Sequence, residues 1–378
     1  MPAWQVPLAD VVVPEDDIAV VADVYRSGWL SMGPRTADLE RALVDYTGAP
    51  HALAVTNGTA ALHLICLAIG LRPGDEAIVP SLTFVASVNA IAYTGATPVF
   101  ADIASLHEPW LSTAAVEAAI TPRTKAIMSM AYGGHPGEIE ALRELADARG
   151  LVLLEDAAHA IGMRHGGRHM GTFGAAGAFS FFSNKNLAAG EGGAIVTSDD
   201  ALAERMRLLR SHGMTTLTWD RHRGHAAGYD VVALGFNYRI DEARAALLTA
   251  RLARLDAEND SRRDLDIRYR EKLAAIDGVT PTAAPAHHIF TVVLDPDRDR
   301  DAVRQALHDR GVQTSLHYPP AHRFSIYAAG VPELPLTDAY AARAITLPLF
   351  ATMTEVQQDL VIDALAAALS PTGARSPR

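Results

Sequence analysis

From residue 51 onward, the chain alternates short apolar runs with longer amphipathic stretches, and turns separate them. Strand-like runs occupy residues 51–55, 76–80, 97–101, 125–131, 151–156, 178–182 and 193–197. Helical periodicity fills the segments 58–70, 85–93 and 138–149 between them. This alternation is typical of a mainly parallel sheet covered by helices on both faces. The pattern therefore predicts an α/β protein whose large domain has three α/β/α layers.

The pattern changes near residue 250. A long charged helix is predicted over residues 241–265 or beyond, and its arginines alternate with leucines and acids, so we expect a solvated helix that links two domains. These arginines are Arg251, Arg254, Arg262 and Arg263. A shorter α+β pattern follows, with strands expected at 289–294 and 344–348 and helices at 300–310 and 354–369.

This change of pattern predicts two domains. We expect a large domain at residues 1–250, whose first 20 residues form an N-terminal arm, and a small C-terminal domain at residues 251–369. The last residues, 370–378, have little apolar content and are predicted to be disordered.

Composition narrows the class of protein. The 378 residues are 49% hydrophobic and 20% charged, which is ordinary for a globular protein with a large core. The net charge of −11 argues against broad nucleic-acid binding. No run approaches the roughly 18 apolar residues of a membrane span, and residues 1–10 do not read as a signal peptide. We expect a cytoplasmic protein that binds neither membranes nor nucleic acid.

The cysteine and the histidines of the chain indicate neither a disulfide nor a metal site. The single cysteine, Cys66, lies in an apolar helical run, so we expect a buried structural thiol and no internal disulfide. The 15 histidines are scattered along the chain. His159, His165 and His169 come nearest to a cluster, but a turn-like segment separates the last two, so we expect no metal site.

Lys185 and Asp156 are the candidate catalytic residues. Lys185 follows the aromatic strand-like run 178–182, where a buried ammonium would be costly unless the amine is consumed in a Schiff base. Asp156 ends the apolar strand 151–156. Taken singly, Lys185 could be a surface lysine and Asp156 a helix cap. Together they are the two protein groups that pyridoxal phosphate requires, a lysine on its aldehyde and an acid at its pyridine nitrogen.

Three further segments could contact such a cofactor. Asn57 and Gly58 open the first long helix, where free backbone N–H groups can hold a phosphate, although simple N-capping explains the segment equally well. Ser180 could be a second phosphate ligand. Phe84 could stack on the ring or belong to the core, and His159 could bind the phenolic oxygen or be an ordinary core histidine.

The order of these motifs resembles the DegT/StrS-type family of pyridoxal-phosphate sugar aminotransferases, which have the aspartate aminotransferase fold (fold type I). The resemblance covers nearly the whole chain. The segments that carry it are Ser27-Gly28-Trp29-Leu30-Ser31-Met32-Gly33-Pro34, Asn57-Gly58-Thr59-Ala60-Ala61-Leu62, Gly74-Asp75-Glu76-Ala77-Ile78-Val79-Pro80, Glu155-Asp156-Ala157-Ala158-His159, residues 180–193, Gly235-Phe236-Asn237-Tyr238-Arg239 and His317-Tyr318-Pro319-Pro320.

The resemblance implies a role for each matched residue. Lys185 is implied to be the Schiff-base lysine and Asp156 the pyridinium partner, with Phe84 and His159 at the ring. The implied phosphate ligands are Gly58, Thr59, Ala60 and Ser180. The implied substrate contacts are Trp29, Tyr238, Arg239 and His317.

Asn237 resembles a phosphate ligand that the family supplies from the neighbouring subunit, which implies a homodimer with shared active sites. A turn that merely caps the helix from residue 241 would explain Asn237 as well.

We therefore expect an aminotransferase that moves an amino group from an amino acid, glutamate or glutamine, to a keto-sugar nucleotide or keto-cyclitol in amino-sugar or secondary-metabolite biosynthesis. The alternatives are another pyridoxal-phosphate reaction, such as an elimination, cyclisation or epimerisation, and a non-catalytic cofactor-binding regulator. Lys185 and Asp156 disfavour the regulator. Lys185 also disfavours the sugar dehydratases of this family, which have histidine at that position.

Overall fold

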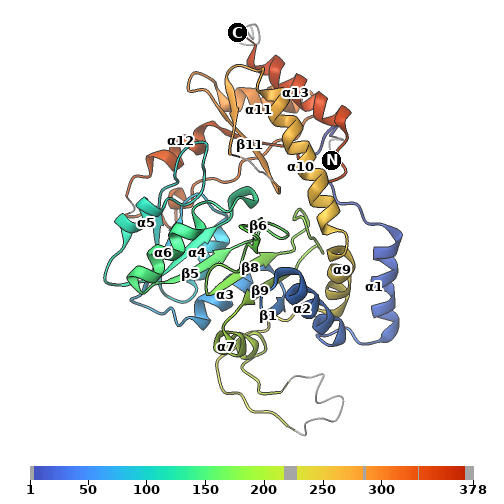
Figure 1. The fold of residues 1–378 in the computed structure, drawn as a ribbon, viewed down its shortest axis with the longest axis vertical. Helices are drawn as coiled ribbons and strands as arrows, with labels where there is room; N and C mark the ends of the chain where they lie inside the picture. Colours follow the sequence, from blue (N-terminus) through green and yellow to red (C-terminus); the bar gives the residue numbers. More distant parts are fainter. Residues whose placement is uncertain (1–3, 217–227, 284–286, 331, 371–378) are drawn as a thin grey trace.

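The computed structural model describes residues 4–216, 228–283, 287–330 and 332–370. Two main sheets organise this part of the chain, a seven-stranded sheet and a three-stranded sheet, and a two-stranded hairpin forms a third (Figure 1). The predicted disordered tail lies, from residue 371 onward, outside the described residues.

The large sheet has the strand order β1-β9-β8-β5-β4-β2-β3. Its strands are β1 (His51–Val55), β2 (Glu76–Pro80), β3 (Thr97–Ala101), β4 (Thr124–Met130), β5 (Val152–Asp156), β8 (Ala176–Ser180) and β9 (Gly193–Thr197). Neighbours from β3 to β8 pair in parallel, and β9 runs antiparallel to both β8 and β1. The predicted strands of this region are confirmed, with ends that differ by a few residues at most.

Helices cover both faces of this sheet. Alternate residues of one strand point to opposite faces, and in β5 Leu153 belongs to one buried hydrophobic cluster and Leu154 to another. The helices α2 (Pro34–Thr47), α5 (Thr113–Ala119), α6 (Ile139–Arg149) and α9 (Glu242–Leu252) pack on the first cluster. The helices α3 (Gly58–Ala68), α4 (Val85–Ala92) and α7 (Asp200–Arg210) pack on the second. The predicted three-layer α/β/α architecture is confirmed.

The first 50 residues contain two helices that the hydrophobic pattern did not reveal. In addition to α2, helix α1 (Glu15–Ser27) lies beside α9 (Figure 1). The chain before α1 reaches the small sheet, because Val6 forms a bridge with Val312 and is buried in the same cluster as the strands of that sheet. A short hairpin, β6 (Arg164–His165) and β7 (Arg168–His169), follows β5.

The single solvated helix predicted over residues 241–265 is wrong. Two helices, α9 and α10 (Leu255–Leu273), meet at Ala253 and Arg254. Arg251 and Arg262 are each only 8% exposed, and Arg251 donates to Asp17 Oδ2 at 2.7 Å. The charge pattern of one helix does not show whether its arginines face solvent or form buried ion pairs, because the acidic partner can come from a helix distant in the sequence.

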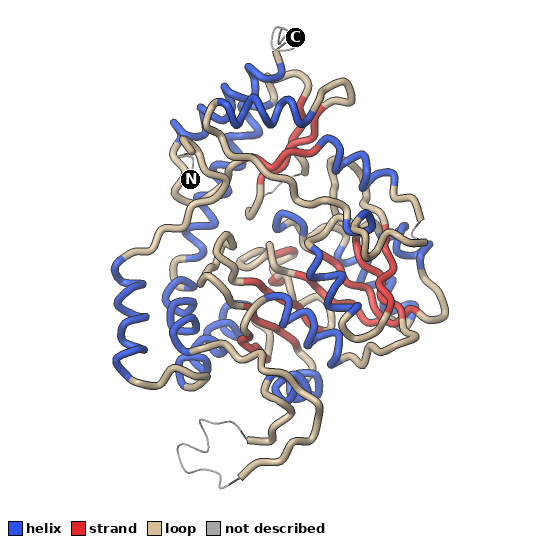
Figure 2. Tube along the Cα trace, turned by 180° about the vertical axis from the view of Figure 1, so that it is seen from behind, coloured by secondary structure: helices blue, strands red, loops and turns tan. Residues whose placement is uncertain are grey.

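The small sheet has the order β10-β11-β12 and is antiparallel. Its strands are β10 (Val279–Pro281), β11 (Phe290–Leu294) and β12 (Ala344–Leu347), and its helices are α11 (Arg300–Asp309), α12 (Pro335–Arg343) and α13 (Glu355–Leu369). Two short 3₁₀ turns, η1 (Tyr132–Gly134) and η2 (Ala321–Arg323), complete the described elements. The strands and helices predicted here are confirmed. Seen from behind, the strands again form two separate groups (Figure 2). The boundary between two domains near residue 250 stays a prediction.

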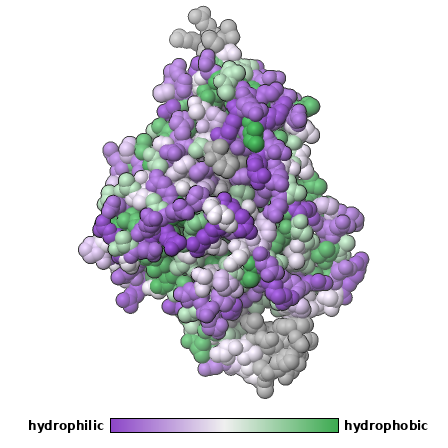
Figure 3. All heavy atoms as spheres, in the orientation of Figure 1, coloured by the Kyte–Doolittle hydropathy of each residue, from purple (hydrophilic) through white to green (hydrophobic). Residues whose placement is uncertain are grey.

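The buried cysteine and the mostly hydrophilic surface are those expected from the composition. Cys66 is fully buried, and burial raises the pKa of its thiol to about 12. Hydrophilic side chains dominate the face shown in Figure 3, with apolar ones scattered among them. Within the described residues, no helix is both long and apolar enough to span a membrane.

Candidate active site

A cavity of about 500 Å³ opens at the edge of the large sheet where its parallel strands end. In open α/β sheets, the carboxyl ends of the strands are where ligands bind. Segments that follow β1, β2, β5 and β8 line this cavity, together with residues 315–318. The predicted site residues that it brings together are Gly58, Thr59, Phe84, Asp156, His159, Ser180, Lys185 and His317.

Asp156 is a buried carboxylate at the end of β5, and it is only 3% exposed. Its Oδ2 accepts from Ser87 Oγ at 2.6 Å, and its Oδ1 accepts from the backbone N–H of Ala158 at 3.1 Å. Burial raises the pKa of Asp156, while these two hydrogen bonds and the charge of Lys185 oppose the rise. A cation placed in the cavity next to Asp156 would therefore find a prepared counter-ion.

Lys185 lies in the loop after β8 and is partly buried. Burial lowers the pKa of its amine to about 8, although the nearby Asp156 acts in the opposite direction. An amine with this pKa is partly unprotonated near neutral pH, as a nucleophile must be. Lys185 therefore has the electrostatic character that Schiff-base chemistry needs.

The first turn of α3 forms a cradle beside Ser180. Asn57 caps the helix, because its Oδ1 accepts from the backbone N–H of Ala60 at 2.8 Å. A Cβ atom at Gly58 would lie 2.9 Å from Ser180 Cβ, so only glycine lets these two segments approach so closely. The N-capping interpretation is confirmed, and it leaves Gly58, Thr59 and Ser180 lining the cavity at the positive end of the helix dipole.

Phe84 and His159 both line the cavity but differ in exposure. Phe84 is 54% exposed, so its interpretation as a core residue is wrong. His159 is buried, and its Nδ1 accepts from the backbone N–H of Gly133 at 3.3 Å. Burial, followed by the charge of Lys185 and neighbouring histidines, lowers the pKa of His159 well below its usual range. The neutral ring therefore carries its hydrogen on Nε2, which donates to Tyr318 Oη at 2.8 Å.

Five of the predicted residues do not line this cavity in the described part of the chain: Trp29, Ala60, Asn237, Tyr238 and Arg239. Tyr238 Oη lies 3.1 Å from His63 Nδ1, and Asn237 is exposed and forms a bridge with Ser211. Asp241 caps α9 by accepting from the backbone N–H of Arg244 at 3.0 Å. The explanation of Asn237 as the cap of this helix is therefore wrong, while its role towards a second subunit stays a prediction.

Several residues at the site were missed by sequence reasoning. Ser87 bonds to Asp156, Tyr318 bonds to His159, and His288 lies 3.4 Å from Lys185. Tyr318 is adjacent to the predicted His317 and could have been included for that reason. The other two gave no local signal, because their partners are 69 and 103 positions away in the sequence.

Three solved structures are similar over nearly the whole chain. The aminotransferase TlmJ from Streptoalloteichus hindustanus is 33% identical, with a TM-score of 0.91 over 98% of this chain and all of that one. DesV of S. venezuelae, solved in complex with a ketimine intermediate, is 37% identical, with a TM-score of 0.87 over 98% of this chain and 99% of that one. DesI, solved in the presence of its TDP-sugar product, is 32% identical, with a TM-score of 0.88 over 99% and 94%.

The family match has a similar extent. Residues 12–366 match the DegT/DnrJ/EryC1/StrS aminotransferase family, so the match includes every residue that lines the cavity. The resemblance expected from the sequence motifs is confirmed. The chain belongs to the DegT/DnrJ/EryC1/StrS aminotransferase family and is an aminotransferase.

Proposed function

We propose that this aminotransferase uses pyridoxal 5'-phosphate to move an amino group from glutamate or glutamine to a keto-sugar nucleotide or keto-cyclitol, in amino-sugar or secondary-metabolite biosynthesis. The observation that carries the proposal is that the buried carboxylate of Asp156 and the amine of Lys185 line one cavity. When bound, this cofactor supplies an electron sink for the carbanion that forms at the α-carbon of an amino donor.

The residues of the cavity fit this cofactor. Asp156 would pair with the protonated pyridine nitrogen, since a buried carboxylate favours a cation beside it. The N-terminus of α3 at Gly58 and Thr59, with the hydroxyl of Ser180, would hold the phosphate. The Nε2–H group of His159 would exchange its hydrogen bond to Tyr318 Oη for one to the phenolic oxygen. We assign the exposed face of Phe84 to ring stacking.

Lys185 would do the proton chemistry. Its Nζ, with a pKa of about 8, can accept a proton from the α-carbon of the donor and return it as an ammonium near neutral pH. A general base contributes most when its pKa lies close to the working pH. The depressed pKa therefore supports a catalytic role for this lysine.

The acceptor and the assembly are the finer parts of the proposal. DesI was solved with a TDP-sugar product, which supports a sugar nucleotide as the class of acceptor here. A homodimer is supported by apolar side chains outside the cavity that stay exposed in one chain, among them Val231, Val232 and Leu234. In such a dimer, Asn237 of one subunit would complete the phosphate site of the other.

The test is product formation by the protein loaded with pyridoxal phosphate. Glutamate or glutamine is supplied with a panel of keto-sugar nucleotides and keto-cyclitols, and the amino product and the oxo-acid are measured by mass spectrometry. Lys185→Ala should lose at least about 100-fold in turnover because the general base is gone. Lys125→Ala, which removes an exposed lysine of β4, is the matched control.

Three outcomes would contradict the proposal. Normal turnover by Lys185→Ala would refute the role of this lysine. Formation of an eliminated, cyclised or epimerised product without an amine would favour the other pyridoxal-phosphate reactions. Tight cofactor binding with no absorbance change on addition of any amino donor would favour a regulator.

A further inference from the structure

Lys185 has an unassigned partner in the segment that leads into β11 of the small sheet. Its Nζ lies 3.4 Å from Nε2 of His288, which is the hydrogen-bond contact of this amine within the described residues. His288 is 6% exposed and precedes β11, whereas Lys185 follows β8, so the two residues lie in loops next to different sheets. The distance is long for a hydrogen bond, but those of catalytic groups often tighten only when substrate binds.

We propose that His288 is a positioning residue that accepts a hydrogen bond from Lys185 Nζ and orients this amine, and that Asn186, Asn259 and Arg262 hold its ring in the required tautomer. The inference rests on the proposed role of Lys185.

Asn186 determines which nitrogen of His288 carries the hydrogen. The Nδ2 group of Asn186 donates to Asn259 Oδ1 and to the carbonyl oxygen of His287, both at 2.8 Å. Its Oδ1 therefore faces His288 Nδ1 at 2.9 Å, and an amide oxygen can only accept. Nδ1 of His288 must donate, so in the neutral ring Nε2 presents its lone pair to Lys185.

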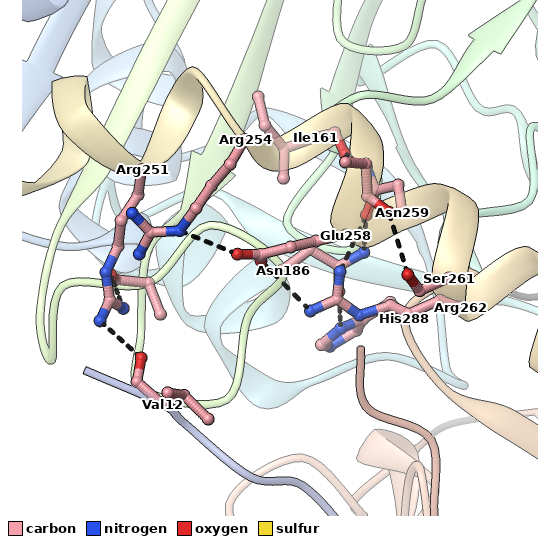
Figure 4. A network of polar contacts seen from close by, with 12 residues as sticks. Val12, Ile161, Asn186, Arg251, Arg254, Glu258, Asn259, Ser261, Arg262 and His288 are labelled. Carbon is pink, nitrogen blue, oxygen red and sulfur yellow. Dashed lines mark hydrogen bonds and ion pairs between the residues drawn. The ribbon is translucent and has the colours of Figure 1, made fainter. Parts of the chain in front are cut away.

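Arg262 and Asn259 prevent the alternative arrangement of these amides (Figure 4). Arg262 Nη1 donates to Asn259 Oδ1 at 3.1 Å, which identifies that atom as the oxygen. Asn259 Nδ2 donates to the carbonyl oxygen of Ile161 at 3.3 Å. Asn186, Asn259 and His288 are buried, so a flipped amide would leave buried polar atoms without good partners.

The charges around Lys185 and His288 indicate that His288 positions the amine and does not take up its proton. The titratable and charged groups that face Lys185 and His288 are Asp156, His159, His317 and Arg262. Burial, followed by electrostatic interaction with Lys185, His317 and Arg262, lowers the pKa of His288 well below its usual range. Because the pKa of Lys185, about 8, lies above that of His288, a proton between the two groups resides on Nζ and the ring acts as an acceptor.

The experiment measures the amine itself, in protein freed of cofactor. Lys185 is labelled with acetic anhydride across a pH series, and the labelled peptide is quantified by mass spectrometry. We expect a midpoint near pH 8 for the unchanged protein. His288→Asn keeps a donor towards Asn186 but is too short to reach Nζ. Its midpoint should fall by about half to one pH unit, because the ammonium loses its acceptor.

Three further variants complete the design. His288→Gln places a polar atom near the former Nε2 and should restore the midpoint to within roughly 0.3 units. His288→Leu removes every polar atom and should lower the midpoint as His288→Asn does. His165→Gln, on the partly exposed hairpin strand β6, is the control and should match the unchanged protein.

Circular dichroism establishes which variants are folded. An unchanged or raised midpoint in a folded His288→Asn or His288→Leu protein would overturn the proposal. Equal shifts in the Asn, Leu and Gln variants would overturn it too, since they would indicate a merely structural histidine. The labelling needs no turnover, so it reports on His288 even if the protein aminates none of the acceptors tested.

Discussion

Ser87→Ala tests whether the charge of Asp156 is maintained by its hydrogen bond. Ser87 Oγ donates to Asp156 Oδ2 at 2.6 Å, and the two side chains are 0% and 3% exposed. Burial already raises the pKa of Asp156, and Ser87 opposes this rise. Removing the hydroxyl should therefore raise the pKa further and narrow the pH range over which the carboxylate is charged.

The magnitude follows from the kind of hydrogen bond. A hydrogen bond to a charged group contributes about 1.5–3 kcal/mol, and each 1.4 kcal/mol is tenfold in an equilibrium or a rate. We expect Ser87→Ala to lower kcat/KM by roughly ten- to 100-fold at acidic pH. Because a carboxylate with a raised pKa ionises at higher pH, part of the activity should return as the pH increases.

The assay is kcat/KM for amine formation between about pH 5 and pH 9, the range over which perturbed carboxyl groups titrate. The control is Ser129→Ala on β4, whose hydroxyl donates to the carbonyl oxygen of Leu154 at 3.2 Å and does not touch Asp156. An acid limb that stays in place, with kcat/KM within about twofold of the unchanged protein, would refute the reasoning.

Two further predictions concern assembly and stability. Mixing inactive Lys185→Ala subunits with weakly binding Asn237→Ala subunits should restore activity after exchange, because one site of each heterodimer then carries neither defect; no recovery above the parents would contradict the shared site. Asp17→Asn should lower the free energy of unfolding by about 3 kcal/mol in urea, because Arg251 and Arg254 lose their buried partner. Burial disfavours the charge of Asp17, but hydrogen bonds from Arg254 and Arg251 lower its pKa below the usual value. The difference in unfolding free energy between Asp17→Asn and the unchanged protein should therefore shrink as the pH falls through that pKa.

Sequence alone was sufficient for the sheet and for the central pair of site residues. Strands of a parallel sheet are buried on both faces, so each appears as an apolar run, and β2 and β5 were predicted to within one residue. Lys185 and Asp156 could be identified because a charged residue that directly follows such a run is costly unless chemistry uses it. These are local signals, and the chain carries them without reference to its fold.

Only the tertiary structure decided which residues act together. The burial of Arg251 depends on its ion pair with Asp17, which lies 234 positions earlier in the chain. The partners of Asp156 and Lys185 likewise come from α4 and from the segment before β11. Hydrogen bonds and ion pairs between distant segments leave no periodic pattern in either segment, because each partner alone is an ordinary polar residue. Their roles become visible only in the folded protein. Folding removes water from both groups, so each can satisfy its hydrogen-bonding capacity only by binding the other.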